Sequence, residues 1–179
     1  MLLDPKFVLE QAQLAQGMSV TDLGAGNVGH FVIPASRIVG ENGSVCAVDI
    51  QQSALSGIES RALLEGLSNI QYLQGDIERE NGVNLPSSSQ DIVLIVNNLG
   101  ISKHKDKIAS EALRLAKVSG KVVVVDWKPS GAIFGLGPKQ EDRVSKEESI
   151  KLFASKNFKI DKIFNAGTSH WGFIAVRVA

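Results

Sequence analysis

The chain has 179 residues and a mass of 19.2 kDa, with 44% hydrophobic and 21% charged residues. These values are typical of one globular domain with a full hydrophobic core and exclude a disordered or fibrous chain. No apolar run approaches the ~18–20 residues that cross a bilayer, and the N-terminal MLLDPKFVLE lacks the pattern of a secretion signal. A single cysteine, Cys46, cannot close an intramolecular disulfide or build a thiolate metal site. We therefore expect a soluble, cytoplasmic protein without a membrane partner or a bound metal.

The formal net charge of zero conceals an uneven distribution along the chain. Residues 1–90 carry four basic and ten acidic side chains, whereas residues 91–179 carry fifteen basic and nine acidic ones. Such asymmetry between halves is typical of a surface that binds an anionic partner. Solvated lysines, which are common on surface helices, are the favoured explanation, so the charge pattern alone does not establish a nucleic-acid partner.

Strands and helices alternate through the first two thirds of the chain. Asp4-Pro5 is a typical helix start, with a capping residue followed by a proline in the first turn. The valine run 122–125 is apolar on both faces, as in a parallel strand covered by helices on each side. The pattern predicts strands over 18–23, 44–49, 70–73, 92–96 and 121–126, and helices over 5–16, 28–39, 52–65 and 103–117.

The last third follows a different pattern. A loop rich in glycine and proline, 129–138, precedes the capping box Ser145 to Glu148, which opens a helix to about residue 156. Two strands follow, 158–164 and 171–178, and the gap between them is too short for a helical crossover, so they should pair antiparallel. The expected fold is α/β, a doubly wound and mostly parallel sheet with an antiparallel C-terminal hairpin. We expect one domain, with an N-terminal helix over 1–17, a ligand-binding core over 18–127 and a substrate-side segment over 128–179.

Three expected strands end in groups that suit a ligand. Residues 22–29 (DLGAGNVG) form a glycine-rich turn between a strand and a helix, where a ligand can approach the backbone. Asp49 closes the second strand and Asp76 follows the third. A tight turn, a helix cap and a turn-forming aspartate are the structural alternatives for these three features. Because ligands bind at the carboxyl ends of the strands in open α/β sheets, the three features together favour a ligand.

Two adenosine-containing ligands fit this pattern. Gly24, Gly26 and Gly29 match the GxGxxG spacing of nicotinamide dinucleotide sites. Asp22, however, would place a carboxylate where such a ligand has its anionic diphosphate, and like charges in a partly desolvated cleft repel. S-adenosylmethionine has an α-ammonium group and a sulfonium but no phosphate, so Asp22 favours this ligand.

At this point the sequence resembles a known family. Residues 22–26 (DLGAG), 47–50 (AVDI), 74–77 (QGDI) and 111–121 (EALRLAKVSGK), together with the terminal hairpin, are similar to the class I S-adenosylmethionine-dependent methyltransferases. The resemblance covers about residues 15–179 and implies a Rossmann-like sheet of seven strands with the last one antiparallel. It also implies that S-adenosyl-L-methionine is the cofactor.

The resemblance implies how the methionine part of the cofactor is held. Backbone around Gly24 and Gly26 lines this part, and Asp22 helps to hold its amino group. The turn is one residue longer than the usual GxGxG spacing of the family, so Gly29 is left without an assigned role. The turn Val118-Ser119-Gly120 replaces the Pro-Gly-Gly of many members, which we expect to have little consequence.

For the nucleoside and the methyl group, the resemblance implies contacts at three strand ends. Asp49 takes the ribose hydroxyls and Ile50 packs on the adenine. Asp76 and Ile77 contact the adenine edge, and Asn97, at the end of the fourth strand, borders the transferred methyl group. The implied reaction is in-line displacement at the sulfonium methyl, for which the enzyme mainly aligns the reactants and removes water.

Catalytic and substrate residues are less well defined. No catalytic residue is assigned, and the candidates are Asn97 and His104, the latter as a general base at a helix start. Trp127, Lys139 and Arg143 follow the fifth strand and are candidates for substrate contact, the two basic residues for an anionic substrate. The favoured acceptor is a small molecule. An RNA or protein methyltransferase using the basic half, a nicotinamide-dependent enzyme and a non-catalytic adenosine-ligand module remain alternatives.

Overall fold

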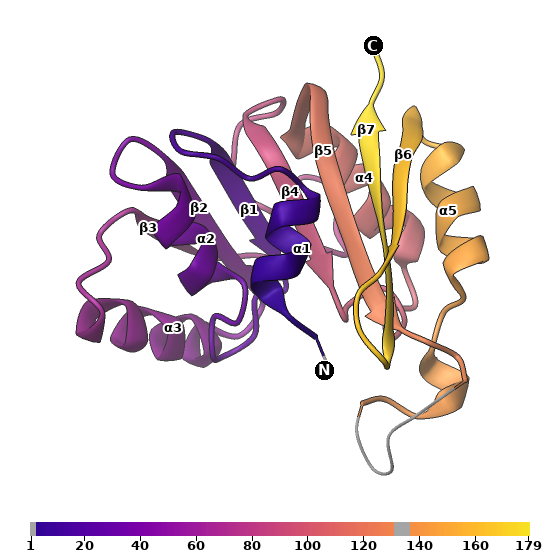
Figure 1. The fold of residues 1–179 in the computed structure, drawn as a ribbon, viewed down its shortest axis with the longest axis horizontal. Helices are drawn as coiled ribbons and strands as arrows, with labels where there is room; N and C mark the ends of the chain where they lie inside the picture. The colour runs from indigo at the N-terminus through magenta and orange to yellow at the C-terminus, as the bar shows by residue number, and fades with distance from the viewer. Residues whose placement is uncertain (1–2, 131–136) are drawn as a thin grey trace.

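The computed structural model describes residues 3–130 and 137–179, which build a seven-stranded sheet covered by helices on both faces (Figure 1). The strand order is β3-β2-β1-β4-β5-β7-β6, and β7 is antiparallel to both of its neighbours. The strands are β1 (Ser19–Leu23), β2 (Ser44–Asp49), β3 (Ile70–Gln74), β4 (Gln90–Val96), β5 (Ala116–Trp127), β6 (Phe158–Asn165) and β7 (His170–Arg177). The helices are α1 (Pro5–Gln11), α2 (Val32–Val39), α3 (Gln52–Leu64), α4 (Lys105–Leu115) and α5 (Lys146–Ala154), with a 3-10 turn η1 (Gln140–Asp142). The predicted fold class is confirmed.

The hydrophobic core has two layers, one on each face of the sheet. Helices α1, α2 and α3 supply one cluster of buried side chains, and α4 and α5 supply the other. The valine run of β5 divides between them, because Val123 and Val125 join the first cluster whereas Val122 and Val124 join the second. All four valines are fully buried, as expected for a parallel strand with helices on both sides.

The candidate site is expected where the strand order of the sheet reverses. From β1 the chain proceeds outward to β2 and β3, and then returns to β4 on the other side of β1. The carboxyl ends of β1 and β4 therefore lie side by side with connections leading in opposite directions. Such a switch point is where open α/β sheets hold their ligands.

Several element boundaries differ from the predictions. Helix α1 ends at Gln11 because Gln13 adopts a left-handed backbone conformation (φ 59°), and α2 begins at Val32 rather than residue 28 because Gly29 has φ 61°. Strand β5 begins at Ala116, within the segment predicted as the end of a helix. The capping box at Ser145 and Glu148 and the antiparallel terminal hairpin are confirmed. Part of the glycine-rich loop, 131–136, lies outside the described residues.

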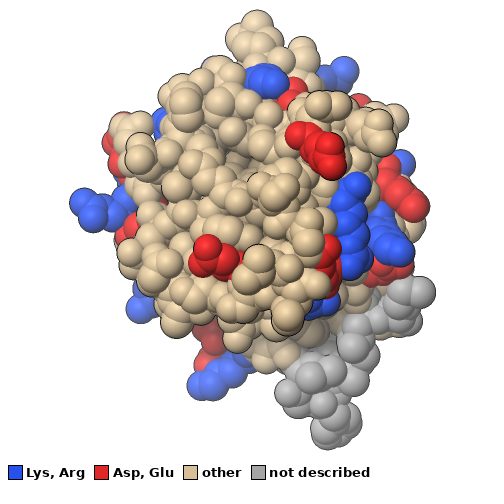
Figure 2. All heavy atoms as spheres, turned by 90° about the vertical axis from the view of Figure 1, so that its left-hand side faces the viewer, with Lys and Arg blue, Asp and Glu red and all other residues tan. Residues whose placement is uncertain are grey.

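The face formed by the edge strand β3 and by α3 carries few charges. Figure 2 shows this face, with Lys, Arg, Asp and Glu scattered around a largely uncharged centre. The acidic excess of residues 1–90 is therefore not gathered into one patch here. In the described ranges, no helix is both long and apolar enough to span a membrane.

Candidate cofactor and acceptor site

The glycine turn after β1 is bound to the end of β2. The backbone N–H groups of Gly24 and Ala25 both donate to the carbonyl of Val48 at 2.9 Å. The N–H of Gly26 donates to the Asp49 carboxylate at 2.9 Å, and that carboxylate also accepts the N–H of Gln51 at 2.9 Å. Asp49 therefore orders both the glycine turn and the start of α3. It does so from beside the helix start, because the capping position is occupied by Gln51.

A cavity of about 360 Å³ opens next to this turn. A side chain at Gly26 would meet no atom within 4 Å, so the backbone there is open to a ligand. Ile50, directly after Asp49, is 59% exposed and offers an apolar surface at the same edge. The lining residues are Gly26, Asn27, Asp49, Gln51, Ser53 and Ala54.

Asp22 is a buried acid with a perturbed pKa. Its side chain is nearly inaccessible, and burial together with the negative charge of Asp49 raises its pKa to about 7. An approaching cation would relieve this unfavourable situation, whereas a diphosphate would worsen it. The pair Asp22 and Asp49 thus fits a ligand with a positively charged group and a diol, as S-adenosylmethionine has.

The segment after β3 lies beside Asp49. The N–H of Gly75 donates to the Asp49 carbonyl at 3.0 Å, and the Gln74 side chain donates to the Ile50 carbonyl at 3.0 Å. Asp76 is half-buried, and its carboxylate accepts the N–H of Glu78 at 2.9 Å, the turn-forming role considered from the sequence. The structure therefore brings the ends of β2 and β3 together, with Asp76 and the half-buried Ile77 on the same edge as Asp49.

The loop after β4 contains a residue that the sequence reasoning did not single out. The amide of Asn98 donates to the carbonyls of Leu23 (2.9 Å), Gly24 (3.1 Å) and Val96 (2.8 Å), which joins the ends of β1 and β4. A Cβ atom on Gly24, which has φ 78°, would lie 2.5 Å from the Asn98 Nδ2 atom. The two consecutive asparagines after the fourth strand were the sequence signal that could have indicated this role of Asn98.

Asn97 has a different role from its neighbour. Its backbone has φ 60°, and its N–H donates to the Val125 carbonyl at 2.9 Å. Its Oδ1 atom is buried without a hydrogen-bond partner among the described residues. Buried polar atoms are rarely left unpaired, so this oxygen is an unusual feature just beyond the end of β4.

The other candidate residues differ in their exposure and in their contacts. Arg143 donates to the carbonyls of Lys128 (3.0 Å) and Pro138 (3.1 and 3.0 Å) and lies over the Trp127 ring at 5.5 Å, so it holds loops together. The Lys139 side chain is 80% exposed and pairs with Glu141. His104 is an exposed residue at the start of α4.

A second cavity of about 490 Å³ lies between α4, α5 and the loops that follow β4 and β5. Among the earlier candidates, Arg143 lines it, whereas Lys139 and His104 do not. Lys103, on the loop after β4, and Lys105, at the start of α4, also line it, and neither was recognised from the sequence. The lining residues are Leu99, Lys103, Lys105, Asp106, Arg143, Val144, Glu148, Ser149 and Leu152.

Two buried titratable groups stand at the ends of β5 and β7. Asp126 accepts the N–H groups of Gly100 (2.9 Å) and Trp127 (2.7 Å), and burial raises its pKa. His170 packs against Trp127 with ring centroids 4.1 Å apart; burial, reinforced by the charges of Lys128 and Arg143, lowers its pKa to about 4. Asp126 thus ties the loop after β4 to the end of β5, whereas both ring nitrogens of His170 are buried without a hydrogen-bond partner among the described residues.

Comparisons with known proteins agree with this geometry. A family model described as "Methyltransferase domain" matches residues 14–170. A ubiquinone/menaquinone biosynthesis C-methyltransferase, UbiE, of Azotobacter vinelandii is 31% identical over 132 residues, 73% of this chain and 51% of the relative. The chain thus spans about half the length of the curated relatives that it matches.

Solved structures give the same result. An S-adenosylmethionine-dependent methyltransferase from Aquifex aeolicus superposes with a TM-score of 0.88 at 26% identity, over 99% of this chain and 91% of that one. A geranyl diphosphate C-methyltransferase from Streptomyces coelicolor A3(2), solved with S-adenosyl-L-homocysteine, has a TM-score of 0.77 at 14% identity, over 97% of this chain and 78% of that one, and shows the shared fold. The chain therefore belongs to the class I S-adenosylmethionine-dependent methyltransferases.

Proposed function

We propose that the protein transfers the methyl group of S-adenosylmethionine to a small organic acceptor with an anionic group. The observation that carries the cofactor half of this proposal is the arrangement of Asp22 and Asp49 around an open glycine turn. Asp49 reaches Gly26 at 2.9 Å beside a cavity of about 360 Å³, while Asp22, at the end of β1, is buried and has a pKa raised in part by the charge of Asp49. A cationic amino-acid tail and a ribose diol satisfy both carboxylates.

Each part of the proposed cofactor site has a separate task. Asp22 offsets the charge of the α-ammonium group, and the backbone at Gly24 and Gly26 lines the methionine part. Asp49 keeps its bond to Gly26 and accepts hydrogen bonds from the ribose hydroxyls with its remaining lone pairs. These contacts orient the cofactor without any rearrangement of the glycine turn.

Residues that follow β2 and β3 bind the adenine in this proposal. Ile50, exposed in the structure, packs on one face of the ring, so its burial in the complex removes apolar surface from water. Asp76 accepts the adenine amino group, and Ile77 contacts the ring edge. The bond from Gly75 to the Asp49 carbonyl supports this assignment, because it ties these residues to the ribose site.

At the reacting end, the bound cofactor supplies a sulfonium methyl that already has a good leaving group. The protein then mainly holds the acceptor in line and excludes water, so a strong base is not required. Asn97 borders this position, and its unpaired Oδ1 atom supports a role in orienting the cofactor or the acceptor. His104, exposed just before α4, is not needed in this scheme.

The cavity of about 490 Å³ between α4 and α5 is the proposed acceptor site. It combines apolar walls, such as Leu99 and Leu152, with three basic side chains and two acidic ones, Asp106 and Glu148. The excess of one positive charge and the apolar walls support an acceptor that has an apolar body and an anionic or acidic hydroxyl group. The relatives named for ubiquinone/menaquinone biosynthesis and for geranyl diphosphate C-methylation also support a small molecule.

The test is to follow isotope-labelled methyl groups from S-adenosylmethionine into a fractionated cell extract. We expect label in the small-molecule fraction, with strong reduction in Asp49→Ala and no reduction in Asp161→Ala, which removes an exposed carboxylate of β6. Label confined to RNA or protein would contradict the proposed acceptor class. Absence of label in every fraction, with no binding of the cofactor, would contradict the proposed activity.

A further inference from the structure

The connection between β3 and β4 is unlike the others at this side of the sheet. Residues 75–89 contain no helix or strand, whereas helices α2 and α3 form the preceding connections. Loops of this length without secondary structure are uncommon and often serve a function. This segment begins with Asp76 and Ile77, the proposed adenine contacts, so whatever holds it also determines the shape of the adenine site.

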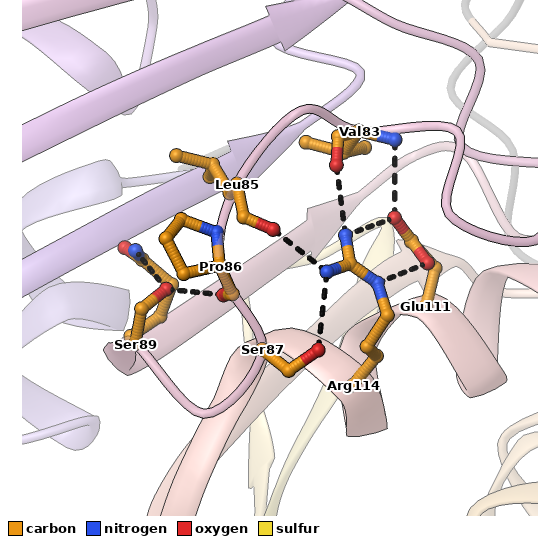
Figure 3. Close-up of polar contacts among 8 residues, drawn as sticks. Val83, Leu85, Pro86, Ser87, Ser89, Glu111 and Arg114 are labelled. Atoms are coloured by element: carbon orange, nitrogen blue, oxygen red, sulfur yellow. Dashed lines mark hydrogen bonds and ion pairs between the residues drawn. The ribbon is translucent and has the colours of Figure 1, made fainter.

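An ion pair on α4 holds this segment (Figure 3). Glu111 and Arg114 are joined by two bonds of 2.6 and 2.9 Å, and their side chains are only 2% and 18% exposed. Glu111 accepts the N–H of Val83 at 3.1 Å, and Arg114 donates to the Val83 carbonyl at 2.8 Å. Arg114 also donates to the Leu85 carbonyl (2.7 Å) and the Ser87 hydroxyl (3.4 Å). One ion pair thus fixes both backbone groups of Val83.

From Val83 this constraint passes directly to Asp76. The residue before Val83 is Gly82, whose carbonyl accepts the N–H of Asp76 at 3.2 Å. The same turn is closed by bonds from Arg79 to the Asp76 carbonyl (3.2 Å) and from Gly82 to the Arg79 carbonyl (3.1 Å). It is also tightly packed, because a Cβ atom on Gly82 would lie 2.0 Å from the Asp76 carbonyl oxygen. A shift of Val83 therefore moves Asp76.

We propose that the Glu111–Arg114 ion pair is a positioning element for adenine recognition, which holds the Asp76 carboxylate where it accepts the adenine amino group. The inference rests on the proposed function, because the contact of Asp76 with adenine is part of it. Arg114 suits this role because its planar guanidinium donates at once to the Glu111 carboxylate, to two backbone carbonyls and to a hydroxyl. A lysine ammonium at this position would satisfy only part of this set.

The test compares two ligands that differ only at C6 and N1 of the base. S-adenosylhomocysteine has an amino group at C6 and an acceptor at N1, whereas S-inosylhomocysteine has a carbonyl at C6 and an N–H at N1. The wild-type protein should prefer the former by roughly ten- to hundredfold, the range of one charge-assisted hydrogen bond. In Arg114→Lys this preference should fall at least threefold, mainly through weaker binding of S-adenosylhomocysteine, as measured by calorimetry.

A matched control separates positioning from general stability. Arg177 also contacts α4, donating to the carbonyls of Leu113 (3.0 Å) and Ala116 (2.7 Å), and it reaches Ser88 (2.9 Å) at the far end of the segment. Arg177→Lys should lower the melting temperature yet keep the wild-type ligand preference. If Arg114→Lys does not fold, Glu111→Gln serves instead, because it removes the charge but keeps an acceptor for Val83; it should also lower the preference.

The outcomes distinguish this inference from the proposed function. A wild-type preference retained in a folded Arg114→Lys or Glu111→Gln protein would overturn the positioning role alone, as would an equal loss of preference in Arg177→Lys. Equal binding of both ligands by the wild-type protein would show that Asp76 does not recognise the adenine amino group. It would contradict the positioning role as well. Failure of the wild-type protein to bind either ligand would overturn the proposed function itself.

Discussion

The buried carboxyl group of Asp22 makes cofactor affinity dependent on pH. In the free protein, burial and the charge of Asp49 raise its pKa to about 7, so the group is largely protonated at pH 5. A bound α-ammonium group favours the ionised form and lowers this pKa. Binding therefore releases a proton whenever the pH lies between the pKa of the complex and about 7. Over that window the affinity should rise by up to about tenfold for each pH increment of one.

Calorimetric titration with S-adenosylhomocysteine from pH 5 to pH 7 measures this effect. The affinity should increase by one to two orders of magnitude and then level off above pH 7, with proton release detected from the buffer dependence of the binding enthalpy. Asp22→Asn should remove most of the increase. Asp91→Asn, a change at the opposite end of the sheet where the carboxylate bonds Ser19 and Lys117, should leave it unchanged.

The same group affects the stability of the free protein. Because the folded pKa of Asp22 lies above the ordinary 3.8, ionisation is harder in the folded state, and its cost grows as the pH rises from about 4 to 7. The difference corresponds to no more than about 4 kcal/mol. Asp22→Asn should therefore stabilise the free protein at pH 7 and above relative to wild type, with little difference at pH 4. An affinity that is flat with pH in the wild type, or equally steep in Asp22→Asn, would refute this reasoning.

Three further substitutions give defined expectations. Asp49→Ala should weaken S-adenosylhomocysteine binding at least tenfold in calorimetry, because it removes charge-assisted hydrogen bonds worth ~1.5–3 kcal/mol each. Gly24→Ala should destabilise the protein by about 1–3 kcal/mol in denaturant unfolding, since its Cβ would meet Asn98 at 2.5 Å and its φ is 78°. Glu111→Ala should cost about 3–5 kcal/mol in the same assay, because it leaves Arg114 and the Val83 N–H without their buried partner.

Each of these expectations has a control and an opposing result. Wild-type affinity in folded Asp49→Ala would mean that the ribose is held elsewhere. Gly26→Ala is the control for Gly24→Ala, because its φ is 66° but its Cβ would meet nothing within 4 Å; an equal loss in both would exclude the contact with Asn98 as the cause. A loss below about 1 kcal/mol in Glu111→Ala would show that the pair contributes no more than an exposed ion pair does.

The strands and the fold class could be predicted from the sequence because the strand signals are local. The valine run 122–125, the glycine turn at 24–29 and the capping box at Ser145 each depend on near neighbours in the chain. Boundaries were less accurate where single residues adopt a left-handed backbone, as Gln13 does at the end of α1. The antiparallel hairpin followed from the shortness of its connection.

The candidate site was predicted in part, for the same physical reason. Asp22, Asp49 and Asp76 could be selected because strand ends meet at one edge of a parallel sheet. Asn98 bonds Leu23, which lies 75 positions away in the chain, and Arg114 bonds Val83, which lies 31 positions away. No local sequence pattern reveals contacts over such separations. Burial, which determines the pKa of Asp22, is likewise a property of the folded chain.

A crystal structure of the protein with S-adenosylhomocysteine would test the cofactor site most directly. The account predicts the ribose hydroxyls within hydrogen-bond distance of Asp49 and the α-amino group on the side of Asp22, with the glycine turn unmoved. A ligand whose ribose is bound away from the end of β2, with Asp49 left in contact only with Gly26 and Gln51, would contradict it.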